Sequence, residues 1–192
     1  MIQFNVPVYL ASQSPRRKKL LEQINLKFEC FSVDLNEEIF PGEIPEKAVL
    51  RLAVEKMNAA EKMKNEGIII TADTIVVLSG RIIGKPEDKN DAFKLLTGLS
   101  GNTHKVLTGF MIKNLSTGQS VIDYETTEVT FRLLDEQEIR DYIETGSPMD
   151  KAGAYGIQDD FGAVFVEKIS GCYYNVVGLP LAKVYKKLME FK

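Results

Sequence analysis

The stretch VPVYLASQSPRRKKLLEQI, residues 6–24, places a strand, a turn and a helix in direct succession and so decides the start of the fold. Its first five residues form a short apolar run that is typical of a buried strand. A small polar turn, residues 11–13, follows. Ser14 is a good N-cap, and Pro15 suits the first position of a helix whose apolar side is formed by the later leucines and isoleucine.

The first turn of this helix carries four consecutive cations, Arg16 to Lys19. The N-terminus of a helix is already partly positive, so a cation there costs roughly 0.3–1 kcal/mol. Cations at this place, next to backbone N–H groups, favour a bound polyanion. The alternative is a solvated basic helix start, but the strand and turn before the helix favour a phosphate site.

The chain as a whole is slightly acidic, so the positive charge at residues 16–19 is a local feature. The chain has 192 residues, enough for one substantial domain, and its formal net charge is -3 at pH 7. A general nucleic-acid binder would need a basic balance, so we expect a small anionic ligand and no nucleic-acid partner. No apolar run approaches the length of a membrane span, and we expect no membrane partner. Two distant cysteines without CxxC spacing, Cys30 and Cys172, indicate reduced thiols in a cytoplasmic protein.

Strands and helices alternate along the rest of the chain. The apolar run 67–78 predicts a buried strand, or a pair of strands, with a polar interruption at Asp73 and Thr74. The other expected elements are a strand at 28–33, a long helix that starts at Pro45 and that Gly67 ends, a hairpin strand at 81–83, a helix at 88–97, strands at 104–113 and 120–133, a helix from Asp135 to Glu144, a glycine-bearing loop at 147–158, a strand at 163–169 and a helix that begins at Pro180. This order predicts a mixed α/β fold with two lobes.

Asp73 is the main candidate for catalysis. It lies between two apolar runs, and a carboxylate there costs several kcal/mol unless it is paired, hydrogen-bonded or bound to a metal. A hydrogen bond to a nearby turn would satisfy it without any function. The functional interpretation is a metal ligand or a base for water. Glu37, in the acidic loop after the second strand, is a second candidate, although a solvated loop explains it better on the sequence alone.

Three further polar side chains are candidates for the site only in combination with the others. Lys85 is held extended by Pro86, Lys56 lies on the long helix, and Gln158 ends the glycine-bearing loop. The sequence has one histidine, His104, and lacks both a GxSxG elbow and a P-loop. Carboxylates, lysines and arginines remain, an inventory that suits attack of water on a phosphate with help from a hard cation.

These pieces, in this order, resemble the Maf family of nucleoside triphosphate pyrophosphatases. The matching segments are LASQSPRR at 10–17, RLAVEKM at 51–57, TADTIVV at 71–77, GKP at 84–86, LSGNTHKVLTG at 99–109, DKAGAYGIQ at 150–158 and YNVVGLPL at 174–181. The resemblance implies a single Maf-like domain over residues 1–192. Its fold would be of the inosine-triphosphatase (Maf/Ham1) type, a mixed sheet with two lobes around a deep cleft. It implies cleavage between the α and β phosphates with a divalent metal, and a role in clearing non-standard nucleotides is compatible with it. A homodimer is also compatible, although no residue requires one.

The resemblance further implies which residues bind the substrate. Ser12, Arg16 and Arg17 fall on the family's phosphate-binding turn. Lys56 and Lys85 match charges of its cleft. We therefore expect these five residues to contact the nucleoside triphosphate.

Two carboxylates match the family's reaction centre. Asp73 matches the residue that is assigned as proton acceptor, and Glu37 matches a further charge of the cleft. We expect Asp73 to be catalytic, and Glu37 together with Asp73 to contact a Mg²⁺ or Mn²⁺ ion.

The preferred base follows from three positions. Arg16, Thr74 and Gln158 occupy positions that the family links to pyrimidines. A sister branch, similar to 7-methylguanosine triphosphatases, has Gln after the Asp and Glu in place of Gln158. The sequence therefore favours the dTTP/UTP branch. It departs from the family at Asp159 and Asp160, where Gly usually follows the IQ, and this adds charge close to Gln158.

Three functions remain open on the sequence. The first is a pyrophosphatase acting on dTTP and UTP. The second is the same reaction on 7-methyl-GTP, another modified nucleotide or a broader pyrimidine set that includes CTP. The third is a nucleotide-binding regulator of septum formation, against which the intact Asp73, Glu37 and Lys85 weigh.

Overall fold

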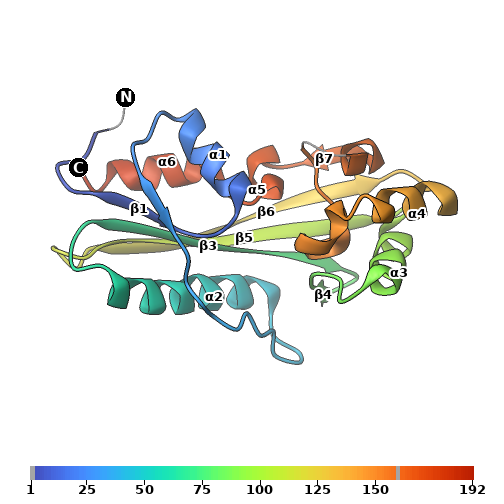
Figure 1. Cartoon of the computed structure of the whole chain (residues 1–192), viewed down its shortest axis with the longest axis horizontal. Helices are drawn as coiled ribbons and strands as arrows, with labels where there is room; N and C mark the ends of the chain where they lie inside the picture. The colour runs from blue at the N-terminus through green and yellow to red at the C-terminus, as the bar shows by residue number, and fades with distance from the viewer. Residues whose placement is uncertain (1–2, 159–160) are drawn as a thin grey trace. The chain divides into compact units, whose positions relative to one another are not determined.

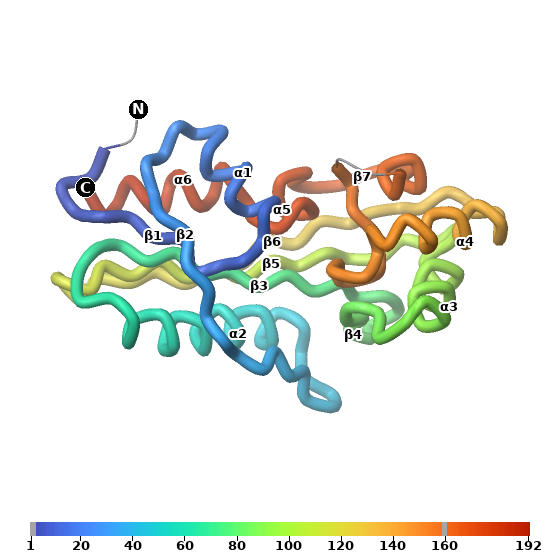
Figure 2. The backbone as a smooth tube through the Cα atoms, viewed as in Figure 1, coloured from blue at the N-terminus to red at the C-terminus, as the bar shows by residue number. Residues whose placement is uncertain are grey.

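The computed structural model describes residues 3–158 and 161–192, and the chain divides into two compact units. Unit 1 comprises Met1–Asp73, Thr108–Glu125 and Gly178–Lys192, and unit 2 comprises Thr74–Leu107 and Thr126–Val177. Three strands contribute residues to both units: β3 (Ile68–Leu78), β5 (Thr103–Asn114) and β6 (Ser120–Phe131). Figures 1 and 2 show the course of the chain through these elements. The expectation of a single domain with two lobes stays a prediction.

Unit 1 is a sheet covered by helices on both faces. Its own elements are β1 (Val8–Ala11), α1 (Pro15–Gln23), β2 (Glu29–Phe31), α2 (Pro45–Ala60), the 3₁₀ turn η1 (Glu61–Met63) and α6 (Leu181–Met189). The strand order is β2-β1-β3-β5-β6, and β1 pairs in parallel with both β2 and β3. Helices α1 and α6 lie on one face of this sheet, and α2 lies on the other (Figure 1).

Helix α2 packs very closely on its face of the sheet. Its buried side is a stripe of small and apolar residues that includes Val49, Ala53 and Met57. A Cβ atom at Gly109 of β5 would lie 2.4 Å from the carbonyl oxygen of Val49. Only glycine therefore allows the backbones of β5 and α2 to approach so closely, and this fixes the helix over the strands.

Unit 2 combines antiparallel pairs with two helices and several short turns. Its own elements are β4 (Arg81–Ile83), α3 (Lys89–Leu99), α4 (Glu136–Glu144), the 3₁₀ turns η2 (Ser147–Asp150), η3 (Ala152–Ala154) and η4 (Phe161–Phe165), β7 (Val166–Ser170) and α5 (Tyr173–Val177). Strand β4 pairs antiparallel with β3, and β7 pairs antiparallel with β6. With the parallel pairs of unit 1, the sheet is mixed, as the sequence predicts.

Local signals in the sequence placed most helix starts correctly. Ser14 caps α1 through a bond from the Arg17 backbone N–H, and Asp88 caps α3. Asp135 and Glu138 form a capping box at the start of α4, where the sequence predicts a helix. Within the described residues, no helix is long and apolar enough to cross a membrane.

The buried strand expected at 67–78 is confirmed, whereas the alternative of two strands and the break at Asp73 and Thr74 are wrong. Strand β3 runs without a break from Ile68 to Leu78. The prediction assumed that a buried carboxylate would interrupt the strand, but a residue of another element neutralises its charge. Smaller corrections concern α2, which ends at Ala60 well before Gly67, and β7, which begins only at Val166 after a 3₁₀ turn. The short helix α5 was not expected.

An aromatic cluster forms part of the interior of unit 2. The rings of His104, Phe131 and Tyr155 contact one another edge to face, at centroid distances of 4.7 to 5.3 Å. His104 Nε2 lies 2.8 Å from the Tyr155 hydroxyl, and the buried His104 Nδ1 has no hydrogen-bond partner among the described residues. Burial lowers the pKa of His104 from an ordinary 6.5 to about 4, so the imidazole is neutral at pH 7.

His104 should make the fold sensitive to mild acid. Between pH 6.5 and about 4 the unfolded chain binds a proton at this ring that the folded chain does not. Stability should therefore fall as the pH falls through this window, by up to about 3 kcal/mol, and the His104 contribution should be constant below it. Denaturant unfolding at several pH values should show a smaller loss in His104→Gln. Equal pH dependence in the two proteins would contradict this assignment.

Candidate active site

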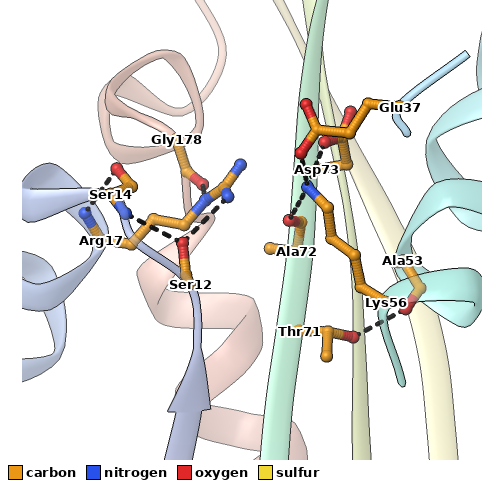
Figure 3. Close-up of polar contacts among 10 residues, drawn as sticks. All are labelled: Ser12, Ser14, Arg17, Glu37, Ala53, Lys56, Thr71, Ala72, Asp73 and Gly178. Carbon is orange, nitrogen blue, oxygen red and sulfur yellow. Dashed lines mark hydrogen bonds and ion pairs between the residues drawn. The ribbon is translucent and has the colours of Figure 1, made fainter. Parts of the chain in front are cut away.

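A buried lysine joins two carboxylates in unit 1. Lys56 Nζ lies 2.6 Å from Asp73 Oδ1 and 2.7 Å from Glu37 Oε1. It also donates a hydrogen bond of 3.3 Å to the carbonyl oxygen of Ala72. The side chains of Lys56 and Asp73 are only 10% and 8% exposed, whereas that of Glu37 is 36% exposed. Figure 3 shows the ammonium group between the two carboxylates.

The spacing of side chains along β3 and α2 explains why Lys56 reaches Asp73. Thr71 and Asp73 are two residues apart on β3, so their side chains leave the same face of the sheet. Ala53 and Lys56 are three residues apart on α2, which places them on the same side of the helix. The Thr71 hydroxyl donates a 2.8 Å bond to the Ala53 carbonyl, and Lys56 reaches Asp73 one step further on. The strand and the helix are therefore joined at two consecutive positions.

Three oxygen atoms thus converge on one cation. They belong to the carboxylates of Glu37 and Asp73 and to the backbone of Ala72. Oxygen donors of this kind suit hard cations, and Mg²⁺ is usually held by one or two carboxylates together with water and substrate phosphates. No group of three His, Cys, Asp or Glu residues that could hold a metal exists in the described part of the chain. The donor set fits a cation that a phosphorylated ligand helps to bind.

The basic turn forms a second polar cluster in unit 1. Arg17 is buried, and its Nε donates a 2.8 Å bond to the Gly178 carbonyl. Its Nη1 lies 3.4 Å from the Ser12 hydroxyl, which also accepts a bond from the Ser14 backbone N–H (Figure 3). Part of the hydrogen-bonding capacity of Arg17 therefore holds the turn itself. The sequence argument did not foresee this structural role.

The two clusters act on each other electrostatically. The pKa of the Arg17 guanidinium is lowered from its ordinary value, chiefly because the group is buried. The carboxylates of Asp73 and Glu37 offset part of this effect, and the charge of Arg16 adds to it. Arg17 and the carboxylates therefore share one local field. Arg16 is half-buried next to this group, whereas Lys18 and Lys19 are exposed. The structure brings together Ser12, Arg17, Lys56, Glu37 and Asp73 in one unit, and their contacts to a ligand stay predictions.

The remaining candidates belong to unit 2. Thr74 and Gln158 are half-buried, and Lys85 is exposed. The backbone N–H of Gly153 donates a 3.0 Å bond to the Gly84 carbonyl, so the loops that carry Gln158 and Lys85 are joined. A Cβ atom at Gly153 would come within 3.0 Å of Val76, two residues after Thr74 on β3. Asp159 and Asp160, where the sequence departs from the family, lie outside the described residues.

The loop before Gln158 has an unusual backbone. Gly153 has φ +71°, and the next residue, the buried Ala154, has φ +60°, a region that non-glycine residues rarely adopt. Such strain costs on the order of 1–3 kcal/mol and persists only where the surroundings hold it. The bond from Tyr155 to His104 and a 3.3 Å bond from the Gly156 N–H to the Tyr142 hydroxyl hold this loop. No pattern in the sequence linked His104 or the two tyrosines to the conformation of this loop.

The contacts of Arg51 with the loop that carries Glu37 were not foreseen from the sequence. Arg51 of α2 pairs with Glu43 and Glu55 and donates to the Glu38 carbonyl. The spacing of Arg51 and Glu55, four residues apart on one helix, was a signal for the pair within α2. No sequence signal pointed to its contacts with the loop before the helix.

The chain matches the sequence profile of the family described as Maf-like protein over residues 7–191. It is 50% identical to the dTTP/UTP pyrophosphatase of Syntrophomonas wolfei over 93% of this chain and 94% of that protein. A dTTP/UTP pyrophosphatase of Clostridioides difficile is 45% identical over 96% of this chain and 94% of that protein.

A solved structure supports the fold. The HAM1 protein from Coxiella burnetii superposes with a TM-score of 0.52 at 14% sequence identity, covering 96% of this chain and 99% of that chain. At this identity the likeness concerns the fold alone. It confirms the expected Ham1-type α/β architecture.

The buried ion pair yields a stability prediction that needs no substrate. Lys56→Met should destabilise the chain by about 3–5 kcal/mol, because it leaves the Asp73 carboxylate buried without its cation. Adding Asp73→Asn to that variant should restore part of the loss, since the carboxylate is then removed as well.

Denaturant unfolding of the two single variants and the double variant measures this coupling. Lys89→Met is the matched control, because the Lys89–Glu144 pair is exposed and should contribute at most about 1 kcal/mol. A double variant no more stable than Lys56→Met would contradict the assignment.

Proposed function

The chain belongs to the Maf family, and we propose on this basis that it is a nucleoside triphosphate pyrophosphatase that hydrolyses dTTP and UTP to the nucleoside monophosphate and pyrophosphate. The observation that carries the proposal is the buried Asp73 carboxylate, held with Glu37 on Lys56, in the same electrostatic field as Arg17. The names of the relatives at 45–50% identity over nearly the whole chain support this substrate class.

Each charged residue has a role in the proposed reaction. Asp73 accepts the proton of the attacking water as its oxygen bonds to the α phosphorus. The bond from that phosphorus to the oxygen shared with the β phosphate breaks, and its electron pair leaves with pyrophosphate. Arg16 and Arg17 donate to phosphate oxygens, and the Ser12 hydroxyl adds a neutral donor. Lys56 and Lys85 act as point charges toward the phosphates.

A divalent cation, Mg²⁺ or Mn²⁺, fits the oxygen donors of Glu37 and Asp73. When bound, it would neutralise phosphate charge and make the α phosphorus more electrophilic. The ammonium of Lys56 already lies against both carboxylates, which supports their ability to hold a cation. Lys56 would then be free to turn toward the phosphates that arrive with the metal.

The preference for uracil and thymine rests on Gln158 and Thr74. The Gln158 amide both donates and accepts, which matches a base edge that carries an N–H between two carbonyl groups. The constrained backbone at Gly153 and Ala154 gives this side chain a defined origin. An ionised Glu could only accept, and would favour the donor-rich edge of guanine.

The cellular setting is part of the proposal. Cys30 and Cys172 are free thiols, which supports a reducing, cytoplasmic environment. The partner is a small nucleoside triphosphate. A homodimer stays a prediction.

The substrate preference should appear directly in a nucleotide panel. With Mg²⁺ or Mn²⁺, dTTP and UTP should be hydrolysed at least roughly tenfold faster, in kcat/KM, than GTP and 7-methyl-GTP, because unpaired polar groups penalise the wrong base. CTP should rank lower than UTP, since its N3 carries no proton. Pyrophosphate release is the readout. A purine triphosphate as the best substrate would overturn the base assignment, and no release from any nucleotide would overturn the enzyme itself.

Asp73→Asn should abolish most of the turnover while the fold is retained. The two side chains have the same shape, but the amide cannot accept the proton, so kcat should fall by at least about 100-fold. Asp141→Asn, on the exposed side of α4, is the matched control and should keep normal rates. Circular dichroism and steady-state kinetics check both variants. Substantial turnover in Asp73→Asn would refute its role as the base.

A further inference from the structure

The segment that carries Glu37 has no regular structure of its own. Residues 32–44 connect β2 to α2, and neither a helix nor a strand is formed there. A loop of this length orders one carboxylate only if other contacts hold its backbone, because each free residue costs on the order of 1–2 kcal/mol to order. The ion pair of Glu37 to Lys56 fixes one side chain and does not by itself order the backbone of so long a segment.

Arg51, a side chain of α2, makes several contacts with this loop. Arg51 Nε and Nη2 donate to the two carboxylate oxygens of Glu43, at 2.7 Å and 2.6 Å. Nη2 also donates a 2.9 Å bond to the Glu38 carbonyl, and Nη1 donates a 3.0 Å bond to Glu55. The guanidinium carbon lies 4.3 Å from the centroid of the Phe40 ring. A single guanidinium therefore contacts three positions of the loop.

The geometry of these contacts is specific to arginine. The bond to Glu43 is bidentate, which adds directional strength to the charge attraction. The side chains of Arg51 and Glu43 are 22% and 12% exposed, so solvent screens this pair less than an ordinary surface pair. Glu43 also turns back on the loop, accepting from the Phe40 N–H at 3.3 Å. A lysine could not form this fork.

The contact to Glu38 leads directly to the active site. Glu38 follows Glu37 in the chain, so fixing its carbonyl fixes the backbone from which the Glu37 carboxylate projects. Arg51 and Lys56 both belong to α2, and they hold adjacent loop residues, one by its backbone and the other by its side chain. We propose that Arg51 is a positioning residue that holds the Glu37 carboxylate in place for a divalent cation.

This inference rests on the proposed function, in which Glu37 contacts the metal. A purely structural role for Arg51 would change stability but would not change metal affinity through Glu37. Direct Mn²⁺ titration in the presence of a non-hydrolysable nucleoside triphosphate analogue, followed by electron paramagnetic resonance, separates the two. The proteins required are the wild type, Arg51→Met, Glu37→Gln and the double variant.

We expect Arg51→Met to weaken Mn²⁺ binding by about 10- to 100-fold, the effect typical of residues that orient a metal ligand. The same substitution should have little further effect in the Glu37→Gln background, because its action passes through Glu37. Arg51→Lys should recover only a minor part of the affinity. Amide hydrogen exchange in residues 35–44 should accelerate in both Arg51 variants.

Arg132→Met is the matched control. Arg132 makes an equally bidentate pair with Glu138, and it belongs to unit 2, whereas the metal candidates belong to unit 1. It should leave Mn²⁺ affinity and exchange in the loop unchanged. Circular dichroism establishes that each variant is folded, and Arg51→Lys keeps the test open if Arg51→Met does not fold.

Three results would overturn the inference. They are unchanged Mn²⁺ affinity in the Arg51 variants, an equal loss with and without Glu37, or a Glu37→Gln protein that binds Mn²⁺ normally. Failure of the proposed function has a different signature. In that case no nucleotide releases pyrophosphate, while the coupling between Arg51 and Glu37 in Mn²⁺ binding persists.

Discussion

The ion pair between Lys56 and Asp73 is the interaction on which the organisation of unit 1 depends. An isolated carboxylate in the middle of an apolar strand would be too costly to bury, so β3 can carry Asp73 only if α2 brings a cation to it. This requirement sets the rotation of α2 about its axis, and the bond from Thr71 to Ala53 sets its position along the strand. The close approach of the two backbones at Gly109 and Val49 allows the ammonium to reach.

Charge balance explains why the neighbouring groups have their present partners. Lys56, Arg17 and the neighbouring Arg16 bring positive charge to this part of unit 1, and Glu37 and Asp73 bring negative charge. A metal ion and a polyphosphate bring further charges of opposite sign. The metal therefore offsets part of the polyphosphate charge when the two enter together. A site of this kind suits a substrate that arrives as a metal complex.

In unit 2, the loop that ends at Gln158 has a constrained backbone. It holds two consecutive residues at positive φ, and one of them is a buried alanine. Buried contacts hold this strained backbone: the Gly153–Gly84 bond, the His104–Tyr155 bond and the aromatic rings around it. A backbone held in this way lowers the ordering cost of any ligand contact that the side chains of this loop make.

The sequence alone determined those features whose physical cause is local. The cap at Ser14 and the helix starts at Pro45 and Asp135 each depend on residues within one or two turns, and each was predicted correctly. The sequence also indicated Asp73 as exceptional, and the family resemblance indicated Glu37 and Lys56. Only the tertiary structure decided how these groups are satisfied. The predicted break at Asp73 was wrong because its neutralising charge lies 17 residues away on α2, and Arg17 finds its acceptor 161 residues away at Gly178. Such partners are chosen by the packing of helix on strand, and no local pattern encodes that choice.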